Sequence, residues 1–522
     1  MAKPKTMIKQ SKKKSKEQVL EDADDYLAVG VDHEDAAGKW RAGDASKSLR
    51  FFNRAIEVYT QGLARYPKSL DLSYNKARVE LEIATHPAMI RALDVPVRAV
   101  LEQALESHRY ALQLDPENPE TLFNTAQVLT TVAEELAKDE ARTDVALKML
   151  EEALELLARC YSVQEFRFEE SEQQRQAMNE TPQEPESSST RESSPSVSAS
   201  AAEDQWFSVV EPITADTLID TVLAQLATLT TLTSVLGDII PPPSSPTLPW
   251  ISEYSTPLVQ KVDVLTNTQD STTTADDSRA EEITLTKTNL TTELLDASFR
   301  HSLIDLATYK TRLSELFTPP PISHPLLIAQ AEALLSVSSA LSLTDPPGYH
   351  ADQWTALSTA ISTLGTAGNI PQSTPAQQAL THSLRGDASL LQHALSFPPN
   401  PYSTAVKHAA QLLANAETFY RNATRLYLSP PPSTAQNSQA GLSIGLTSSA
   451  PDPEAALLAQ RAAFRCTVAQ VLQGKPADLG ADLGGKIDLG GQSRAWVAEQ
   501  MEEMAEEELV SEGFAEKLLG RA

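Results

Sequence analysis

Residues 104–119 read ALESHRYALQLDPENP, and this stretch decides the fold class. Ala104 and Ala111 stand seven positions apart, so they lie on nearly the same helix face, where small side chains let a neighbouring helix approach closely. Pro116 then stops the helix. The same spacing recurs elsewhere, at Ala55, Tyr59, Gly62, Leu63 and Pro67 and at Ala146, Leu150, Ala153, Leu154 and Leu156. Such units cannot bury their apolar faces alone, so they predict a solenoid of stacked helical hairpins with a concave binding surface.

Apolar residues at three- and four-residue spacing continue through most of the chain, without the alternation typical of strands. We therefore expect an all-α protein, a helical-hairpin solenoid followed by a second helical region with long disordered insertions. In the first region we predict helices at 46–66, 70–84, around 104, 122–136 and from 144 to 161 or beyond, with an irregular connection over 86–97. In the second we predict helices at 218–236, 298–317, 324–343, 352–364, 376–395, 401–428, 453–472 and 493–519.

Composition divides the chain into four parts. Residues 1–18 are predicted to be a disordered basic tail, and residues 19–177 the helical repeat domain. Residues 178–203 are rich in serine and poor in apolar residues, so they are predicted to be a disordered linker. Residues 204–522 form the second helical region, with disordered loops expected near 241–278, 429–452 and 474–492.

The chain has 522 residues and a net charge of −27, although its first sixteen residues hold seven lysines and no acid. So acidic a body repels phosphate backbones, which argues against nucleic-acid binding except through the basic tail. It would attract a basic protein partner, while the plainer interpretation is that acidity keeps a large protein soluble. The tail fits an import signal, an RNA contact or a solvated segment.

Residue types needed for catalysis are present but not arranged for it. The nine histidines and two cysteines show no metal-ligand spacing, and the glycines of 474–491 lack the lysine and serine or threonine of a phosphate loop. We expect no enzyme activity, no cofactor and no metal. No secretory signal or run of about 18 apolar residues is evident, so we expect a cytoplasmic or nuclear protein without a membrane span.

Residues 36–161 resemble the tetratricopeptide repeat (TPR) superfamily through the spacings quoted above. The layout of basic tail, repeat helices and acidic body is similar to fungal TPR proteins, some of which are dedicated assembly chaperones for basic ribosomal proteins. The resemblance implies a protein-binding scaffold, chaperone or adaptor, whose first repeat helices line the binding face. The residues expected on that face are Tyr74, Asn75, Arg78, Phe123, Asn124 and Gln127, with Glu80, Glu82 and Glu120 as acids that attract a basic partner.

Two further functions fit the same resemblance. TPR co-chaperones of Hsp70 and Hsp90 grip a C-terminal carboxylate, and Asn75 matches the clamp asparagine of the second repeat. Glu120 and Asn124 then stand where a lysine and an arginine are expected, so the clamp would be atypical. The chain could instead be a structural subunit of a stable complex, docked through Trp496, Met501 and Met504, which are equally suited to capping its own solenoid.

Overall fold

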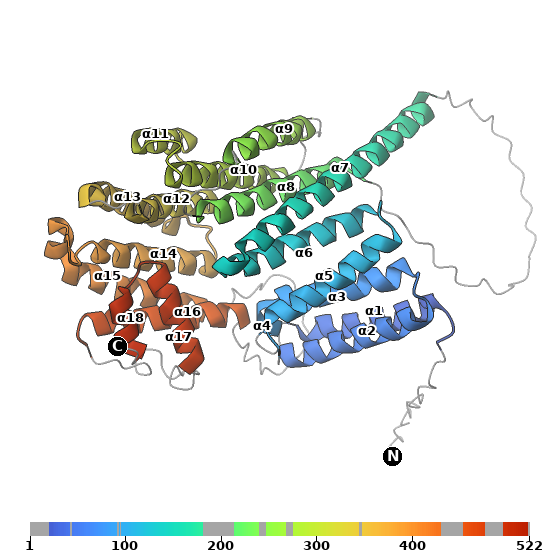
Figure 1. The fold of residues 1–522 in the computed structure, drawn as a ribbon, viewed down its shortest axis with the longest axis horizontal. Coiled ribbons are helices and arrows are strands. Elements are labelled where there is room, and N and C mark those ends of the chain that lie inside the picture. The colour runs from blue at the N-terminus through green and yellow to red at the C-terminus, as the bar shows by residue number, and fades with distance from the viewer. Residues whose placement is uncertain are drawn as a thin grey trace, which may run out of the picture. The chain divides into compact units, whose positions relative to one another are not determined.

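A computed structural model describes residues 20–41, 44–90, 93, 95–180, 213–239, 247–267, 275–343, 347–429, 453–475 and 494–519. Within these ranges the structure is helical, with no strand (Figure 1). The all-α prediction is confirmed. The chain divides into two compact units, residues 1–116 and 117–522, so the division falls inside the predicted 19–177 domain. Whether the helix pairs form regular TPR repeats stays a prediction.

The helices of the first unit are α1 (Ala23–Trp40), α2 (Ala45–Arg65), α3 (Leu70–Thr85), α4 (Pro87–Ile90) and α5 (Val97–Leu114). Those of the second unit are α6 (Pro119–Ala137), η1 (Glu140–Arg142), α7 (Thr143–Glu180), α8 (Ala215–Gly237), α9 (Thr247–Asn267), α10 (Ala275–Arg300), α11 (Leu306–Leu316), α12 (His324–Leu343), η2 (Pro347–Tyr349), α13 (His350–Gly368), α14 (Pro375–Ala394), α15 (Ser403–Tyr427), α16 (Pro453–Leu472), α17 (Arg494–Glu506) and α18 (Glu512–Leu519). Most of the predicted helices are confirmed within a few residues.

In the first unit, α1 and α2 form a hairpin whose close approach depends on a glycine. A Cβ atom added to Gly30 of α1 would lie 2.1 Å from the ring of Tyr59 of α2. The Tyr59 hydroxyl donates to Glu34 of α1, and that carboxylate also accepts from Arg78 of α3. A glycine, a buried tyrosine, a carboxylate and an arginine thus join three successive helices.

The second unit repeats this arrangement at α14, α15 and α16. A Cβ atom at Gly386 of α14 would lie 2.5 Å from the ring of Tyr420 of α15. The Tyr420 hydroxyl donates a 2.7 Å hydrogen bond to Asp387, which pairs at 2.5 Å with Arg465 of α16. Arg465 also pairs at 2.5 Å with Glu507, just after α17.

The two C-terminal helices close this part of the second unit. Met501 and Met504 of α17 are 0% and 1% exposed and pack against α14, α15 and α16, with Trp496 partly buried beside them. The residues that were candidates for docking on another chain therefore cap the protein's own helices.

The predicted loop over 241–278 is wrong, because α9 and the start of α10 occupy much of it. Pro257 and many threonines suggested a loop, but α9 buries Ile251, Leu258 and Val262. In α10 the threonine hydroxyls bond backbone carbonyls one turn earlier, as in the 2.8 Å bond from Thr288 to Thr284. Packing and these internal bonds override weak helix propensity.

Two other predicted helices are each divided in two. The one over 298–317 is the end of α10 followed by α11, because Ser302 adopts a positive φ of 59° and Asp305 caps the new helix. The one over 493–519 is α17 followed by α18, with Glu508 at the same φ of 59°. The connection expected over 86–97 contains the short helix α4.

Several predicted segments lie mostly or wholly outside the described residues. They are the tail 1–18, the linker from 181 onward, and the loops 430–452 and 476–492. Residues 178–180 belong to α7, so the linker does not begin at 178.

By length and composition alone, α8 and α12 could cross a membrane. The expectation that the chain has no membrane span stays a prediction. Most of the apolar window of α8 and half of that of α12 is buried inside the protein. Since the core helices of large helical proteins have the same composition, this is weak evidence for a span.

Candidate partner-binding pocket

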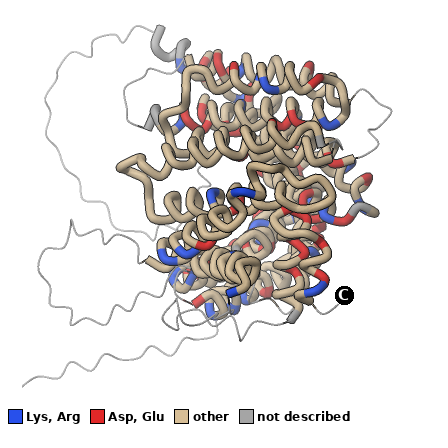
Figure 2. Tube along the Cα trace, turned by 90° about the vertical axis from the view of Figure 1, so that its left-hand side faces the viewer, with Lys and Arg blue, Asp and Glu red and all other residues tan. Residues whose placement is uncertain are grey.

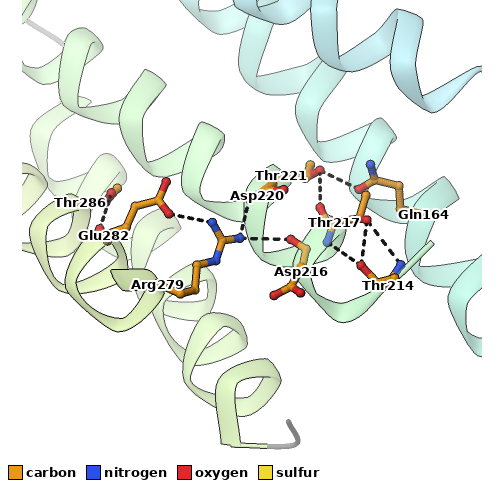
Figure 3. Close-up of polar contacts among 9 residues, drawn as sticks. All are labelled: Gln164, Thr214, Asp216, Thr217, Asp220, Thr221, Arg279, Glu282 and Thr286. Atoms are coloured by element: carbon orange, nitrogen blue, oxygen red, sulfur yellow. Dashed lines mark hydrogen bonds and ion pairs between the residues drawn. The ribbon is translucent and has the colours of Figure 1, made fainter. Parts of the chain in front are cut away.

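One end of α8 is fixed between α7 and α10 by polar contacts (Figure 3). The Thr221 hydroxyl of α8 donates a buried 2.7 Å hydrogen bond to Gln164 of α7. From α10, Arg279 donates to the carboxylate of Asp220 and, at 3.2 Å, to the carbonyl oxygen of Asp216. These bonds set the register of three helices that share a cavity at the opposite end of α8.

The cavity is a pocket of about 840 Å³ at the C-terminal end of α8. It is lined by residues of α6, η1, α7, α8 and α10 and of their connections: Glu134, Ala137, Lys138, Ala141, Thr143, Asp144, Thr230, Thr231, Ser234, Val235, Asp238, Ile239 and Glu293. Four of these residues are acidic, whereas Lys138 is the one basic residue among them. We call this cavity the acidic pocket.

Hydroxyl groups of α8 join it to α6, both inside the acidic pocket and next to it. Thr228 lies 3.3 Å from the hydroxyl of Thr130 on α6, and Thr231 donates at 3.1 Å to Glu134. The far sides of the same helices are apolar, since Leu129 of α6 and Leu229 of α8 are fully buried. The core therefore positions the helices, while their polar faces shape the pocket.

Helix ends add to the negative character of the pocket. Lys138 is the C-cap of α6 and Asp238 is the C-cap of α8, so the carbonyl ends of two helices meet here. The carbonyl end of a helix carries a partial negative charge that favours a cation. The N-terminus of α7 opposes this effect, but Asp144 lies in its first turn.

Glu293 is the acid whose protonation is most altered. The pKa of Glu293 is raised to about 7, chiefly by burial and also by the carboxylates of Asp296 and Asp238, while Arg300 and a hydrogen bond with Ser234 oppose the shift. Arg300 is engaged nearby, at 2.5 Å from Asp296 and 3.7 Å from Asp238. Near neutral pH the charge of Glu293 can therefore respond to a bound cation.

The lining of the acidic pocket is rich in hydrogen-bond acceptors. Carboxylates and hydroxyls offer acceptors for the N–H groups of an ammonium or guanidinium ion. Among the described residues no group of three or more His, Cys, Asp or Glu side chains is placed to hold a metal ion. Figure 2 shows charged positions of both signs along the helices. In the lining of the acidic pocket, by contrast, acids outnumber bases by four to one.

The predicted binding-face residues of α3 lie in the first unit, and several are already engaged. Asn75 donates at 2.8 Å to the carbonyl oxygen of Asp71. Glu80 is 5% exposed and pairs at 2.7 Å with Lys76. Its carboxylate is therefore buried, whereas the sequence predicts it on the binding face. Tyr74 is partly buried and makes at least one polar, aromatic or electrostatic contact with another residue.

Arg78 and Glu82 do lie together, in a hollow of about 420 Å³ within the first unit. The other residues of this hollow are Glu34, Asp35, Gly38, Lys39, Arg41 and Phe52. Arg78 pairs with Glu34, and Arg41 pairs with Glu82. Acids and bases are balanced here, which makes the hollow a weaker attractor for a cation than the acidic pocket.

The predicted residues of α6 lie in the second unit, on the face that leads to the acidic pocket. Glu120 and Gln127 are exposed, and Phe123 and Asn124 are partly buried. Glu134 follows Gln127 by seven positions, as Gln127 follows Glu120, so all three share one face of the helix. Continuing this spacing would have found Glu134 in the sequence, whereas nothing local pointed to the residues from α8 and α10.

The comparisons with known proteins give partial similarities. The chain is 31% identical over 153 residues to a UPF0656 protein of Schizosaccharomyces pombe, covering 29% of this chain and 33% of the relative. It is 31% identical over 81 residues to an uncharacterised protein of Saccharomyces cerevisiae, covering 15% of this chain and 14% of the relative. The matched segments thus span a third or less of these relatives. No protein-family model matches the chain.

Proposed function

We propose that the protein is a non-catalytic binding protein, a scaffold, adaptor or dedicated chaperone for a basic polypeptide, and that the acidic pocket receives a lysine or arginine side chain of that partner. The observation that carries the proposal is the lining of the pocket, with four carboxylates and one lysine around about 840 Å³. The net charge of −27 would add long-range attraction for the same partner.

The physical basis is a difference between general and local attraction. Exposed acids on a surface attract a basic chain weakly and are screened by salt. In the acidic pocket Glu293 is partly buried, whereas Glu134, Asp144 and Asp238 are exposed, so the pocket differs from the rest of the surface in bringing four carboxylates and several hydroxyls to one cavity. A lysine or arginine that entered it could make several charge-assisted hydrogen bonds at once. The volume exceeds one side chain and leaves room for part of the backbone that carries it.

A direct test measures the affinity of a fluorescent lysine- and arginine-rich peptide for the full chain by anisotropy. The pocket variant Glu134→Gln with Asp144→Asn is compared with Glu151→Gln and Glu155→Gln, which alter exposed acids of α7 outside the pocket by the same total charge. We expect the pocket variant to weaken binding by ~10-fold or more, about 1.4 kcal/mol, and the matched control by less than ~2-fold. Equal losses would show that overall acidity alone attracts the peptide.

The partner itself can be sought by affinity purification and mass spectrometry at low and high salt. One abundant basic protein lost at high salt supports the proposal, because charge complementarity is screened. Several subunits retained at a fixed ratio at high salt would favour a structural subunit of a stable complex. We also propose that the protein is located in the cytoplasm or the nucleus, in the same compartment as its basic partner.

The co-chaperone alternative receives less support. A carboxylate clamp needs cations, and the positions that match it hold Glu120 and Asn124. The Asn75 amide that would complete the clamp already bonds Asp71. Capture of a peptide that ends in the acidic C-terminus of Hsp70 or Hsp90 would revive this alternative.

A further inference from the structure

A second group of side chains, on α14 and α15, has the opposite charge. Arg385 is partly buried with its guanidinium 4.2 Å from the ring centre of Phe419, and its Nε atom is buried without a hydrogen-bond partner. Within the part of the chain that the structure describes, no carboxylate pairs with Arg385. In contrast, the partly buried Arg279 and Arg300 each pair with two acids.

The electrostatics of Arg385 reflect this isolation. The carboxylates beside Arg279 and Arg300 raise the pKa of those side chains. Burial lowers the pKa of Arg385, and no acid opposes it. A partly buried charge without a counter-ion is unfavourable, so an anion that reached it would be bound with little competing interaction.

His382 lies one turn before Arg385 and contacts the same aromatic ring. Its ring stacks on Phe419 at 6.0 Å between centres, and its Nδ1 atom is buried without a hydrogen-bond partner. Burial lowers the pKa of His382, and the charge of Arg385 lowers it further. His382 is therefore neutral at pH 7 and supplies a polar N–H group but no second positive charge.

The fold explains why these three side chains meet. His382 and Arg385 are three positions apart and share one face of α14. Phe419 precedes Tyr420, whose ring packs against Gly386 and brings α15 close to α14. The glycine that allows this approach thus also places the aromatic ring beneath the guanidinium.

We propose that His382, Arg385 and Phe419 form a binding site for a single carboxylate group of an acidic peptide segment. A guanidinium stacked on an aromatic ring keeps its edges free of the ring, and since Nε of Arg385 is buried, the outer edge with the two Nη atoms is the one that would meet the two oxygens of a carboxylate. The site holds one positive charge, which suits a carboxylate better than a doubly charged phosphate. A chain that attracts a basic partner at one pocket would then hold an acidic segment at another.

The test uses the full chain and a fluorescein-labelled tetraglutamate peptide at about 0.15 M salt, where the long-range repulsion from the net charge of −27 is screened, with the tetraglutamine peptide for comparison. Arg385→Met keeps an apolar stem over Phe419 and removes the charge, while Arg425→Met removes an exposed charge from α15. We expect tetraglutamate to bind in preference to tetraglutamine, and Arg385→Met to weaken binding by ~10-fold, with less than ~2-fold for Arg425→Met.

Two further readouts separate a binding site from a structural contact. Binding of the peptide should raise the pKa of His382, measured by NMR on histidine-labelled protein, because an anion stabilises the imidazolium form. Acetate should compete better than the same concentration of phosphate. Equal affinity in Arg385→Met, an unshifted His382 or stronger competition by phosphate would overturn the assignment.

Discussion

The hydroxyl of Thr231 on α8 donates a hydrogen bond of 3.1 Å to a carboxylate oxygen of Glu134 on α6. Both residues line the acidic pocket. The bond joins two helices at their C-terminal ends and leaves the other oxygen of Glu134 for a ligand. It connects the packing of the core with the geometry of the proposed binding site.

Replacement of Thr231 by valine should loosen Glu134 while keeping the shape of the side chain. We expect the basic peptide to bind about 2- to 5-fold more weakly and the free energy of unfolding to fall by about 0.5–1.5 kcal/mol, the usual contribution of one hydrogen bond. Anisotropy and urea titration measure the two quantities. Thr231→Ser retains the hydroxyl and should restore affinity; failure to do so would mean that Glu134 is not positioned by this bond.

Glu293 should make stability depend on pH. Its folded pKa of about 7 lies above the ordinary value of 4.5. The folded state therefore holds the proton more tightly, and its stability falls as pH rises from about 4.5 to 7. We expect Glu293→Gln to be more stable than the unaltered protein by about 1–3 kcal/mol at pH 8, with little difference at pH 4. Urea titrations at both pH values measure this, and a difference independent of pH would contradict it.

Gly386 should tolerate no side chain. An added Cβ atom would lie 2.5 Å from the ring of Tyr420, whereas at Gly365 of α13 nothing lies within 4 Å. We expect Gly386→Ala to lower the free energy of unfolding by about 1–3 kcal/mol through overpacking. Gly365→Ala should raise it by up to ~1 kcal/mol, because alanine favours a helix over glycine. Thermal or urea unfolding compares them, and similar effects would show that α14 and α15 are not in tight contact.

Arg465 should hold the C-terminal helices in place. It is 6% exposed and lies 2.5 Å from both Asp387 and Glu507. Arg465→Met leaves the largely buried Asp387 carboxylate without its cation, while Glu507 keeps its 3.1 Å pair with Arg461. We therefore expect a loss of about 3 kcal/mol and faster hydrogen exchange over 494–519. Arg461→Met removes a more exposed pair with Glu503 and should cost about 1 kcal/mol or less. Unchanged exchange in the Arg465 variant would contradict this role.

The helices could be predicted where local signals agree. The bounds of α12 and α16 match the predicted 324–343 and 453–472, because prolines and apolar periodicity mark both segments. The helix α9 could not be predicted in this way, since Pro257 and the polar residues around it favour a loop until Ile251 and Leu258 are buried by neighbouring helices. Tertiary packing decided the outcome there.

The acidic pocket could be predicted only in part. The exposed face of α6 follows from the spacing of Glu120 and Gln127, and the pocket lies at its end. Glu293 is far from Glu134 in the sequence, and no motif links them. The sequence also could not reveal that Glu80 is paired with Lys76, because charge alone does not show burial.

The central claim, that a cation enters the acidic pocket, is tested most directly by the affinity of the basic peptide at pH 6 and pH 8 for the unaltered protein and Glu293→Gln. A lysine or arginine beside Glu293 favours its ionised form, so binding below its pKa of about 7 must release a proton. We predict that affinity rises up to ~10-fold more between these pH values in the unaltered protein than in the variant. The same pH dependence in both proteins would contradict occupation of the pocket by a cation.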